Sequence, residues 1–245
     1  RNAELFWRQQ HLLRLLVGLP FLGWIFITPN LVTILLLECI WGLCQALLAP
    51  EVAWPVYWFL LTPPVITFGY SGCLLVNVIL QKRLVVGRLG PGLVIGPPGS
   101  CSFDDAAWKQ AHWNSFRRWL HERSVTSHVF EHTLDALVNS ELLSCVHRQL
   151  GAKVGRRVQS DNFKVVDHDC VEIEDFAVFG SCVEMNCDAP IANEPWRREL
   201  KPIRLLRASN CLDHCLVMPG VVVGEAAVLG TRTLAHAGAC FPPDS

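Results

Sequence analysis

The stretch that most constrains this chain is a six-residue repeat between residues 205 and 234. Cut every six residues, it reads LLRASN, CLDHCL, VMPGVV, VGEAAV and LGTRTL. The first position of each unit is apolar, and the fifth is always small or β-branched. An antiparallel strand pair alternates with period two. A constant period of six, with glycine after the leading residue in the last two units, therefore predicts stacked repeat units.

The six-residue period predicts a parallel β-helix in which three units make one triangular coil. The leading apolar side chains would point inward and stack on their equivalents, and the fifth residue would be small because the chain turns there. A β-sandwich or barrel is the alternative. Weaker repeats reach back to Val154, and a loop has to interrupt them within residues 186–202, where the period breaks.

Two apolar runs, residues 31–49 and 56–80, come before the repeats. At ~1.5 Å per residue, the first is just long enough to cross a hydrocarbon core of ~30 Å. The connection PEVAWP has no Lys or Arg, whereas the outer flanks carry Arg8, Arg14, Lys82, Arg83 and Arg88. The positive-inside rule then predicts a multi-pass membrane hairpin with the repeats on the cytoplasmic side. A pair of buried helices in a soluble protein is the alternative.

These features predict three segments in the 245 residues. Residues 1–86 would be the membrane segment, with transmembrane helices at 31–49 and 56–80. Residues 87–149 would hold a Gly/Pro linker (87–105) and amphipathic helices, which lie either on the membrane surface or against the repeats. One of these helices would begin after Ser140 and end near Gly151. Residues 150–245 would be the β-helix, truncated, since the chain lacks an initiator Met and we expect it to be a piece of a longer polypeptide.

Charge and cysteine content argue against two classes of partner. A net charge of −1 without a basic face gives no reason to expect nucleic-acid binding. The eleven cysteines lack the spacing of a disulfide framework or of a zinc site. Cys211 and Cys215, for example, occupy inward positions of one repeat unit, where core packing explains both. We therefore expect neither a metal nor a bound cofactor.

Four stretches together resemble a known family. They are KRLVVGRLGPG, LLSCVHRQLGAKVGRRV, VVDHDCVEIED and VMPGVVVGEAAVLG. The sequence from about Lys82 onward resembles the membrane-bound C-terminal region of the polylysine-synthetase-like nonribosomal peptide synthetases. That resemblance implies the left-handed β-helix of the hexapeptide-repeat acyltransferase superfamily. The expected fold class is thus a membrane α-helical hairpin followed by a parallel, left-handed β-helix with a helical lead-in.

The resemblance also implies an activity and partners. The activity would be acyl or aminoacyl transfer, in which an amine attacks a carrier-bound thioester and an amide bond forms. The implied partners are carrier and adenylation domains of the same chain, the lipid bilayer, and neighbouring β-helix copies that form a pseudo-trimer or a homotrimer. The donor would be a phosphopantetheine-carrier thioester or an acyl-CoA.

Histidines are the candidate bases for such a reaction, because imidazole accepts protons near neutral pH. His168 lies between Asp167 and Asp169, whose carboxylates would raise its pKa and orient the ring. His214 is the fourth residue of its repeat unit and would point outward; His236 is a weaker candidate.

The family carries a histidine in the loop that interrupts the repeats, and this chain has none there. The loop offers Asp188, Asn193, Glu194, Arg197 and Arg198 instead. Of these we expect Glu194, Arg197 and Arg198 to bind substrate. Two alternatives stay open: a CoA-dependent O- or N-acyltransferase, and a catalytically inactive scaffold copy.

Overall fold

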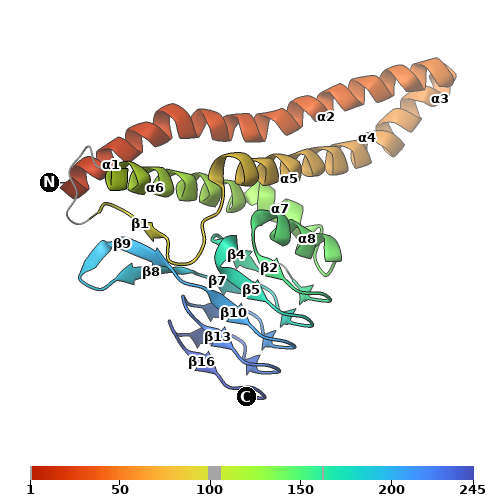
Figure 1. Ribbon diagram of the computed structural model, residues 1–245. Helices are drawn as coiled ribbons and strands as arrows, with labels where there is room; N and C mark the ends of the chain where they lie inside the picture. Colours follow the sequence, from red (N-terminus) through yellow and green to blue (C-terminus); the bar gives the residue numbers. More distant parts are fainter. Residues whose placement is uncertain (1, 99–105, 162) are drawn as a thin grey trace.

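The structure is a computed structural model that describes residues 2–98, 106–161 and 163–245. The end of the expected Gly/Pro linker, residues 99–105, lies outside the described residues. The chain begins with a long helical arm made of three successive elements: α1 (Asn2–Leu13), η1 (Arg14–Gly18) and α2 (Leu19–Leu47). A return arm follows, made of α3 (Pro50–Pro55), η2 (Val56–Leu61), α4 (Thr62–Pro64), η3 (Val65–Gly69), α5 (Tyr70–Gln81) and η4 (Lys82–Val86). The two arms lie side by side above the sheets (Figure 1).

Three shorter helices connect the arms to the sheets: α6 (Ala106–Val125), α7 (His128–Asp135) and α8 (Glu141–Leu150). Ser140 caps α8 by accepting a hydrogen bond from the backbone N–H of Leu143, and Gly151 ends it at φ +115°. The predicted start and end of this helix are confirmed. Helix α6 packs against the arms, because its buried Phe116 and Leu120 share a hydrophobic cluster with Leu22.

Very short parallel strands make up most of the regular structure after the helices. They form three sheets, in the orders β16-β13-β10-β5-β2, β14-β11-β6-β3 and β15-β12-β7-β4. The strands before residue 190 are β2 (Lys153–Val154), β3 (Gln159–Ser160), β4 (Lys164–Val165), β5 (Val171–Ile173), β6 (Val178–Phe179) and β7 (Glu184–Met185). Those after residue 200 are β10 (Ile203–Leu205), β11 (Asn210–Cys211), β12 (Leu216–Val217), β13 (Val222–Val223), β14 (Val228–Leu229), β15 (Leu234–Ala235) and β16 (Cys240–Phe241).

The six-residue period sets where these strands fall. The leading position of each unit is the last residue of a strand, and it pairs in register with equivalents on either side, as Leu205 does with Ile173 and Val223. The leading and fifth side chains are buried in the main core, where Leu205 and Val221 are completely covered.

The turn between units falls on the fourth position. Ala208, His214, Ala226 and Arg232 all have φ between 55° and 60°, and Gly220 and Gly238 occupy the same position at φ +79° and +73°. The left-handed conformation is unfavourable for residues with a Cβ. The predicted corner at the fifth position was therefore wrong by one residue.

An antiparallel sheet interrupts the repeats. The predicted loop 186–202 is a hairpin of β8 (Asp188–Ile191) and β9 (Glu194–Leu200), and β9 also pairs with β1 (Val94–Ile95) from the linker. The order β1-β9-β8 ties the segment after the helical arms to the middle of the repeats. Figure 1 shows this hairpin projecting beside the parallel sheets.

The expected fold class was wrong. The helices are followed by separate short parallel sheets of four or five strands that are not strongly curled, and these do not form a clear left-handed β-helix. The physical reason is that a period of six residues fixes the spacing of two-residue strands. It does not fix the hand of the connections or the curl of the sheets.

For the expected membrane hairpin, the structure supports only the presence of two helices of suitable length and composition. Two helices, Glu4–Leu47 and Pro50–Val86, are long and apolar enough to cross a membrane by length and composition. That is weak support for a membrane hairpin, because core helices of soluble proteins pass the same test. Both helices are mostly uncovered in the structure, however, with 22% and 11% of their most apolar windows buried.

Candidate functional site

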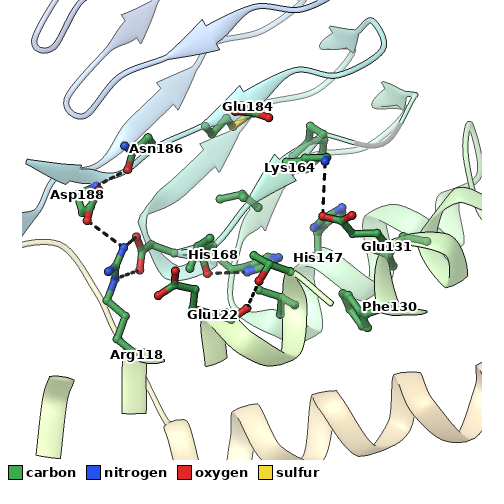
Figure 2. Close-up of a pocket in the computed structure, with 18 of the residues that line it drawn as sticks. Arg118, Glu122, Phe130, Glu131, His147, Lys164, His168, Glu184, Asn186 and Asp188 are labelled. Atoms are coloured by element: carbon green, nitrogen blue, oxygen red, sulfur yellow. Dashed lines mark hydrogen bonds and ion pairs between the residues drawn. The ribbon is translucent and has the colours of Figure 1, made fainter. Parts of the chain in front are cut away.

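A pocket of about 530 Å³ lies where the helices meet the sheets. Helices α6, α7 and α8 supply one wall, and strands β4, β7 and β8 supply the other. The structure thereby brings together residues that are far apart in sequence, among them Arg118, His147 and His168 (Figure 2), and Arg198 also lines the pocket. A volume of this size suits a small-molecule ligand.

His168 lines this pocket from a single 3₁₀ turn, η5 (His168–Cys170), which leads into β5. Its side chain is almost completely buried, with 2% exposed. Nδ1 lies 3.2 Å from the carbonyl oxygen of Val166 and 3.3 Å from Nε2 of His121. A carbonyl oxygen only accepts hydrogen bonds, so we assign the proton of the neutral ring to Nδ1 on the contact with Val166. Nε2 then carries the lone pair, and no described residue hydrogen-bonds to it.

Burial lowers the pKa of His168 well below its usual value. Nearby His121, His147 and Lys82 lower it further, whereas the hydrogen bond to Val166 acts in the opposite direction. The sequence predicted a raised pKa from the two flanking carboxylates. That was wrong, because both carboxylates are bound by cations from distant segments. The ring is therefore neutral at physiological pH and retains a basic nitrogen.

Asp167 forms a two-point ion pair with Arg118 of α6. The contacts are 2.9 Å from Nε to Oδ1 and 3.0 Å from Nη2 to Oδ2. The same guanidinium lies 3.2 Å from Oδ2 of Asp188 on β8, which also accepts a hydrogen bond from Arg198 at 2.6 Å. Arg118 thus joins α6 to the turn before His168 and to the hairpin. Asp167 holds this turn in place and does not touch the imidazole.

Asp169, on the other side of His168, pairs with Lys82 at the end of the return arm. Both side chains are more than nine-tenths buried. The carboxylate also accepts a hydrogen bond from the backbone N–H of Leu89 at 2.7 Å. A Cβ on Gly151 would stand 2.3 Å from Oδ1 of Asp169, so only glycine leaves room for this pair. The Lys82–Asp169 pair therefore connects the helical arm to the turn that carries His168.

His147 forms part of the pocket wall beside His168. Its ring stacks on Phe163, with centroids 4.2 Å apart, and lies 5.4 Å from the ring of His168. Neither of its nitrogens has a hydrogen-bond partner among the described residues. Burial lowers the pKa of His147 to about 4. This histidine is neutral and acts as a flat, weakly polar wall.

The mouth of the pocket is acidic. Glu122 and Glu184 line it, and neither is in an ion pair within the described part of the chain. Glu131, also at the mouth, lies 3.6 Å from Lys164. An approaching ammonium group would find two carboxylates without a paired cation.

The structure places the six predicted site residues in two groups. His168, Asp167 and Arg198 line the pocket. His214 is exposed in a turn, where its backbone N–H donates to Ser181, and it is not part of the pocket. Glu194 and Arg197 form an ion pair with each other on β9, outside the pocket lining.

Sequence reasoning missed His121, His147 and Arg118. A signal existed for His147, because Leu143, Val146, His147 and Leu150 form the buried face of α8 at helical spacing. A histidine on an apolar face is a candidate for a pocket wall.

Two comparisons with known proteins identify no family for this chain. No protein-family model matches the sequence, and no curated protein matches it. In residues 2–98, 106–161 and 163–245, no group of three or more His, Cys, Asp or Glu side chains is arranged to hold a metal ion.

Proposed function

We propose that this chain is a membrane-tethered acyl-transfer domain, in which an amine attacks a thioester and an amide bond forms. His168 is the base. The observation that carries the proposal is the neutral imidazole of His168, whose Nδ1–H donates to Val166 and whose Nε2 is left without a partner in a pocket of substrate size. This is the arrangement that general base catalysis requires.

The reaction uses the groups around the pocket in the following way. The amine enters as an ammonium ion past Glu122 and Glu184, whose carboxylates attract it, and it releases one proton to solvent before it attacks. As the C–N bond forms, Nε2 of His168 accepts a proton from the attacking nitrogen. The C–S bond then breaks, and the thiol leaves with a proton returned by the imidazolium. Arg118 and Asp167 act through position, by holding the turn that presents His168.

The donor in this proposal is a thioester of a phosphopantetheine carrier. An acyl-CoA, which presents the same thioester group, is the alternative donor. Carrier and adenylation domains of a larger peptide-synthetase-like polypeptide would supply the carrier thioester. Copies of the repeat segment, either further copies along one chain or a homotrimer, are the proposed neighbours. The resemblance of the junction stretches supports these partners.

The membrane attachment belongs to the same proposal. The side-chain amide of Asn77 in the return arm donates to the hydroxyl of Thr28 in α2 at 2.6 Å. From this contact to the tip of the hairpin, the two arms contact mainly each other. The outer part of α2, residues 29–47, is roughly 28 Å long at ~1.5 Å per residue, which matches a hydrocarbon core of ~30 Å. Exposed Trp54 and Trp58 lie at the tip, and Lys82 and Arg83 lie at the opposite end. This distribution favours a multi-pass hairpin with the sheets on the cytoplasmic side.

The test is amide formation by the purified chain in lipid nanodiscs. The donors are acyl thioesters of N-acetylcysteamine, of CoA and of a carrier protein, and the acceptor is a primary amine. His168→Ala should lower kcat by roughly 10²- to 10⁴-fold, the usual contribution of a general base. The matched control is His214→Ala, which should retain activity. Equal turnover by wild type, His168→Ala and buffer would contradict the proposal and leave a scaffold role.

A further inference from the structure

The candidate pocket lies in the seam between two separate hydrophobic cores. Val125, Phe130 and Leu134 on the helix side belong to the cluster that the helices form. Phe163 and Met185 on the strand side belong to the cluster inside the sheets. All five are at least nine-tenths buried, yet all five line the pocket. The two cores therefore leave part of their apolar surface facing the same space.

One set of charged groups lies away from this apolar part, whereas the Glu131–Lys164 pair, 3.6 Å apart, lies beside it. Arg118, Asp188 and Arg198 form one connected network at one end of the pocket, where every cation faces a carboxylate. Figure 2 shows Arg118 and Asp188 on one side of His168, with Phe130 and His147 on the other. His147 closes the apolar side with a ring whose pKa is lowered by burial, so it presents no charge there.

We propose that this apolar side of the pocket is an acyl-binding compartment, which takes an uncharged aliphatic acyl group of the donor and places its carbonyl beside His168. The five apolar side chains Val125, Phe130, Leu134, Phe163 and Met185 define the compartment. The inference rests on the proposed function and deepens it by naming the class of acyl group. The amine acceptor would occupy the acidic mouth instead, so the two substrates enter different parts of one pocket.

The physical basis is the transfer of the ligand's own hydrocarbon from water into a pocket whose wall is apolar. Each methylene moved from water to an apolar site contributes about 0.8 kcal/mol, which is roughly a fourfold gain in affinity. A terminal ammonium would lose most of this gain, because the carboxylate beside the compartment, that of Glu131, already lies 3.6 Å from Lys164 and desolvation of the charge is costly. Acyl-chain length and charge are therefore the variables to change.

The first experiment measures binding without turnover. Ketone analogues of acyl N-acetylcysteamine thioesters, with CH₂ in place of sulfur, are titrated into the full chain in nanodiscs by calorimetry. The acyl groups are acetyl, butyryl, hexanoyl and 6-aminohexanoyl. We expect affinity to rise about tenfold for each two methylenes from acetyl to hexanoyl, and to fall at least tenfold when the terminal ammonium is added. The same order is expected for kcat/KM with the thioesters themselves.

The second experiment fills the compartment. Val125→Phe should abolish the gain from acetyl to hexanoyl while it leaves the acetyl analogue within about twofold. Val129→Phe is the matched control, because Val129 is exposed on α7 and outside the pocket, and it should preserve the gain. If Val125→Phe proves unstable in thermal unfolding, Phe130→Leu replaces it, and this variant should move the preferred length to longer chains.

The outcomes separate the two proposals. Flat affinity across the series, or tighter binding of 6-aminohexanoyl than of hexanoyl, overturns the compartment even if His168-dependent turnover is found. A length-dependent affinity that Val125→Phe removes supports the compartment even if no turnover occurs, in which case the acyl-transfer proposal alone fails. A length-dependent affinity that both phenylalanine variants leave unchanged places the binding elsewhere and also overturns the compartment.

Discussion

Nδ1 of His168 lies 3.2 Å from the carbonyl oxygen of Val166, two residues earlier in the chain. We assign the ring proton to Nδ1 on this short-range contact, in which no carboxylate takes part. The carboxylates that flank His168 in sequence are used to anchor its turn, Asp167 to α6 and Asp169 to the end of the return arm. The protein thus separates the orientation of the imidazole from the attachment of the segment that carries it.

The pH dependence of stability tests the buried state of His147. Its pKa is about 4 in the folded protein against an ordinary value of 6.5, so the unfolded chain binds more protons between these values. The free energy of unfolding should therefore fall as the pH drops from about 6.5 to 4, by roughly 3 kcal/mol from this residue. His147→Phe should make the fall in this window smaller, and the remainder comes from His121 and His168, whose pKa values burial also lowers; at pH 7 the variant should be as stable as wild type or more so.

Urea unfolding at pH 4.5 and pH 7 measures this difference. His214→Ala is the control, because His214 is exposed and its removal should leave the pH dependence unchanged. If His147→Phe retained the full acid sensitivity, His147 would not be the buried neutral group that the structure shows.

The Lys82–Asp169 pair links the helical arm to the candidate site, and Lys82→Met measures how much the pair contributes to the free energy of unfolding. The substitution leaves a buried carboxylate without its cation, so we expect a loss of about 3–5 kcal/mol. Adding Asp169→Asn should restore part of it, because the uncharged amide oxygen can still accept the Leu89 N–H. Unfolding midpoints in denaturant give both values.

Lys153→Met is the comparison for a pair near the surface. Lys153 binds Glu172 with 69% of its side chain exposed, and its loss should change stability by less than about 1 kcal/mol. Equal effects of the Lys82 and Lys153 variants would show that Asp169 is not buried as described.

Backbone strain at the fourth repeat position gives a prediction about two adjacent alanines. Ala226 has φ +55°, and Ala226→Gly should raise the melting temperature, because relief of roughly 1 kcal/mol of strain outweighs the added freedom of the unfolded chain. Ala227→Gly should lower it, because Ala227 is buried and packs in the core. Differential scanning calorimetry distinguishes the signs, and a lower melting temperature for Ala226→Gly would contradict the assigned turn.

Membrane binding by the outer part of the arms is tested with a charge on its uncovered face. Leu35 of α2 is 64% exposed, and Leu35→Lys should greatly reduce flotation with liposomes, since a lysine near the centre of a bilayer costs about 3 kcal/mol. Leu142 of α8 is 63% exposed but lies outside the arms, so Leu142→Lys is the control. Unchanged flotation of Leu35→Lys would contradict insertion of this arm.

Local patterns in the sequence predicted local structure. The period of six located the strands, Ser140 and Gly151 marked the ends of α8, and the triplet Asp167-His168-Asp169 pointed to a residue that lines the pocket. These features depend on residues within a few positions of one another. The hand and curl of the sheets depend on how connections pack, and the period does not encode them.

The chemistry of the pocket depends on long-range contacts, which is why much of it was missed. Arg118 and Lys82 reach the carboxylates beside His168 from 49 and 87 positions away in the sequence. With both carboxylates paired, burial of the ring decides the direction of the shift and lowers the pKa of His168, and Lys82 lowers it further. Pairing of β9 with β1 likewise turned an expected loop into a sheet, and left Glu194 and Arg197 outside the pocket.

The most direct test of the account compares the protonation of His168 with the rate of amide formation. Two-bond ¹H–¹⁵N spectra, assigned with His168→Ala, report the protonation of each ring nitrogen, and kcat/KM is measured over the same pH range. We predict protonated Nδ1 and unprotonated Nε2 at pH 7. We also predict one pKa, below 6.5, for both the Nε2 signal and the acid limb of the rate. A protonated Nε2 at pH 7, or a rate that does not follow this pKa, would contradict His168 as the base.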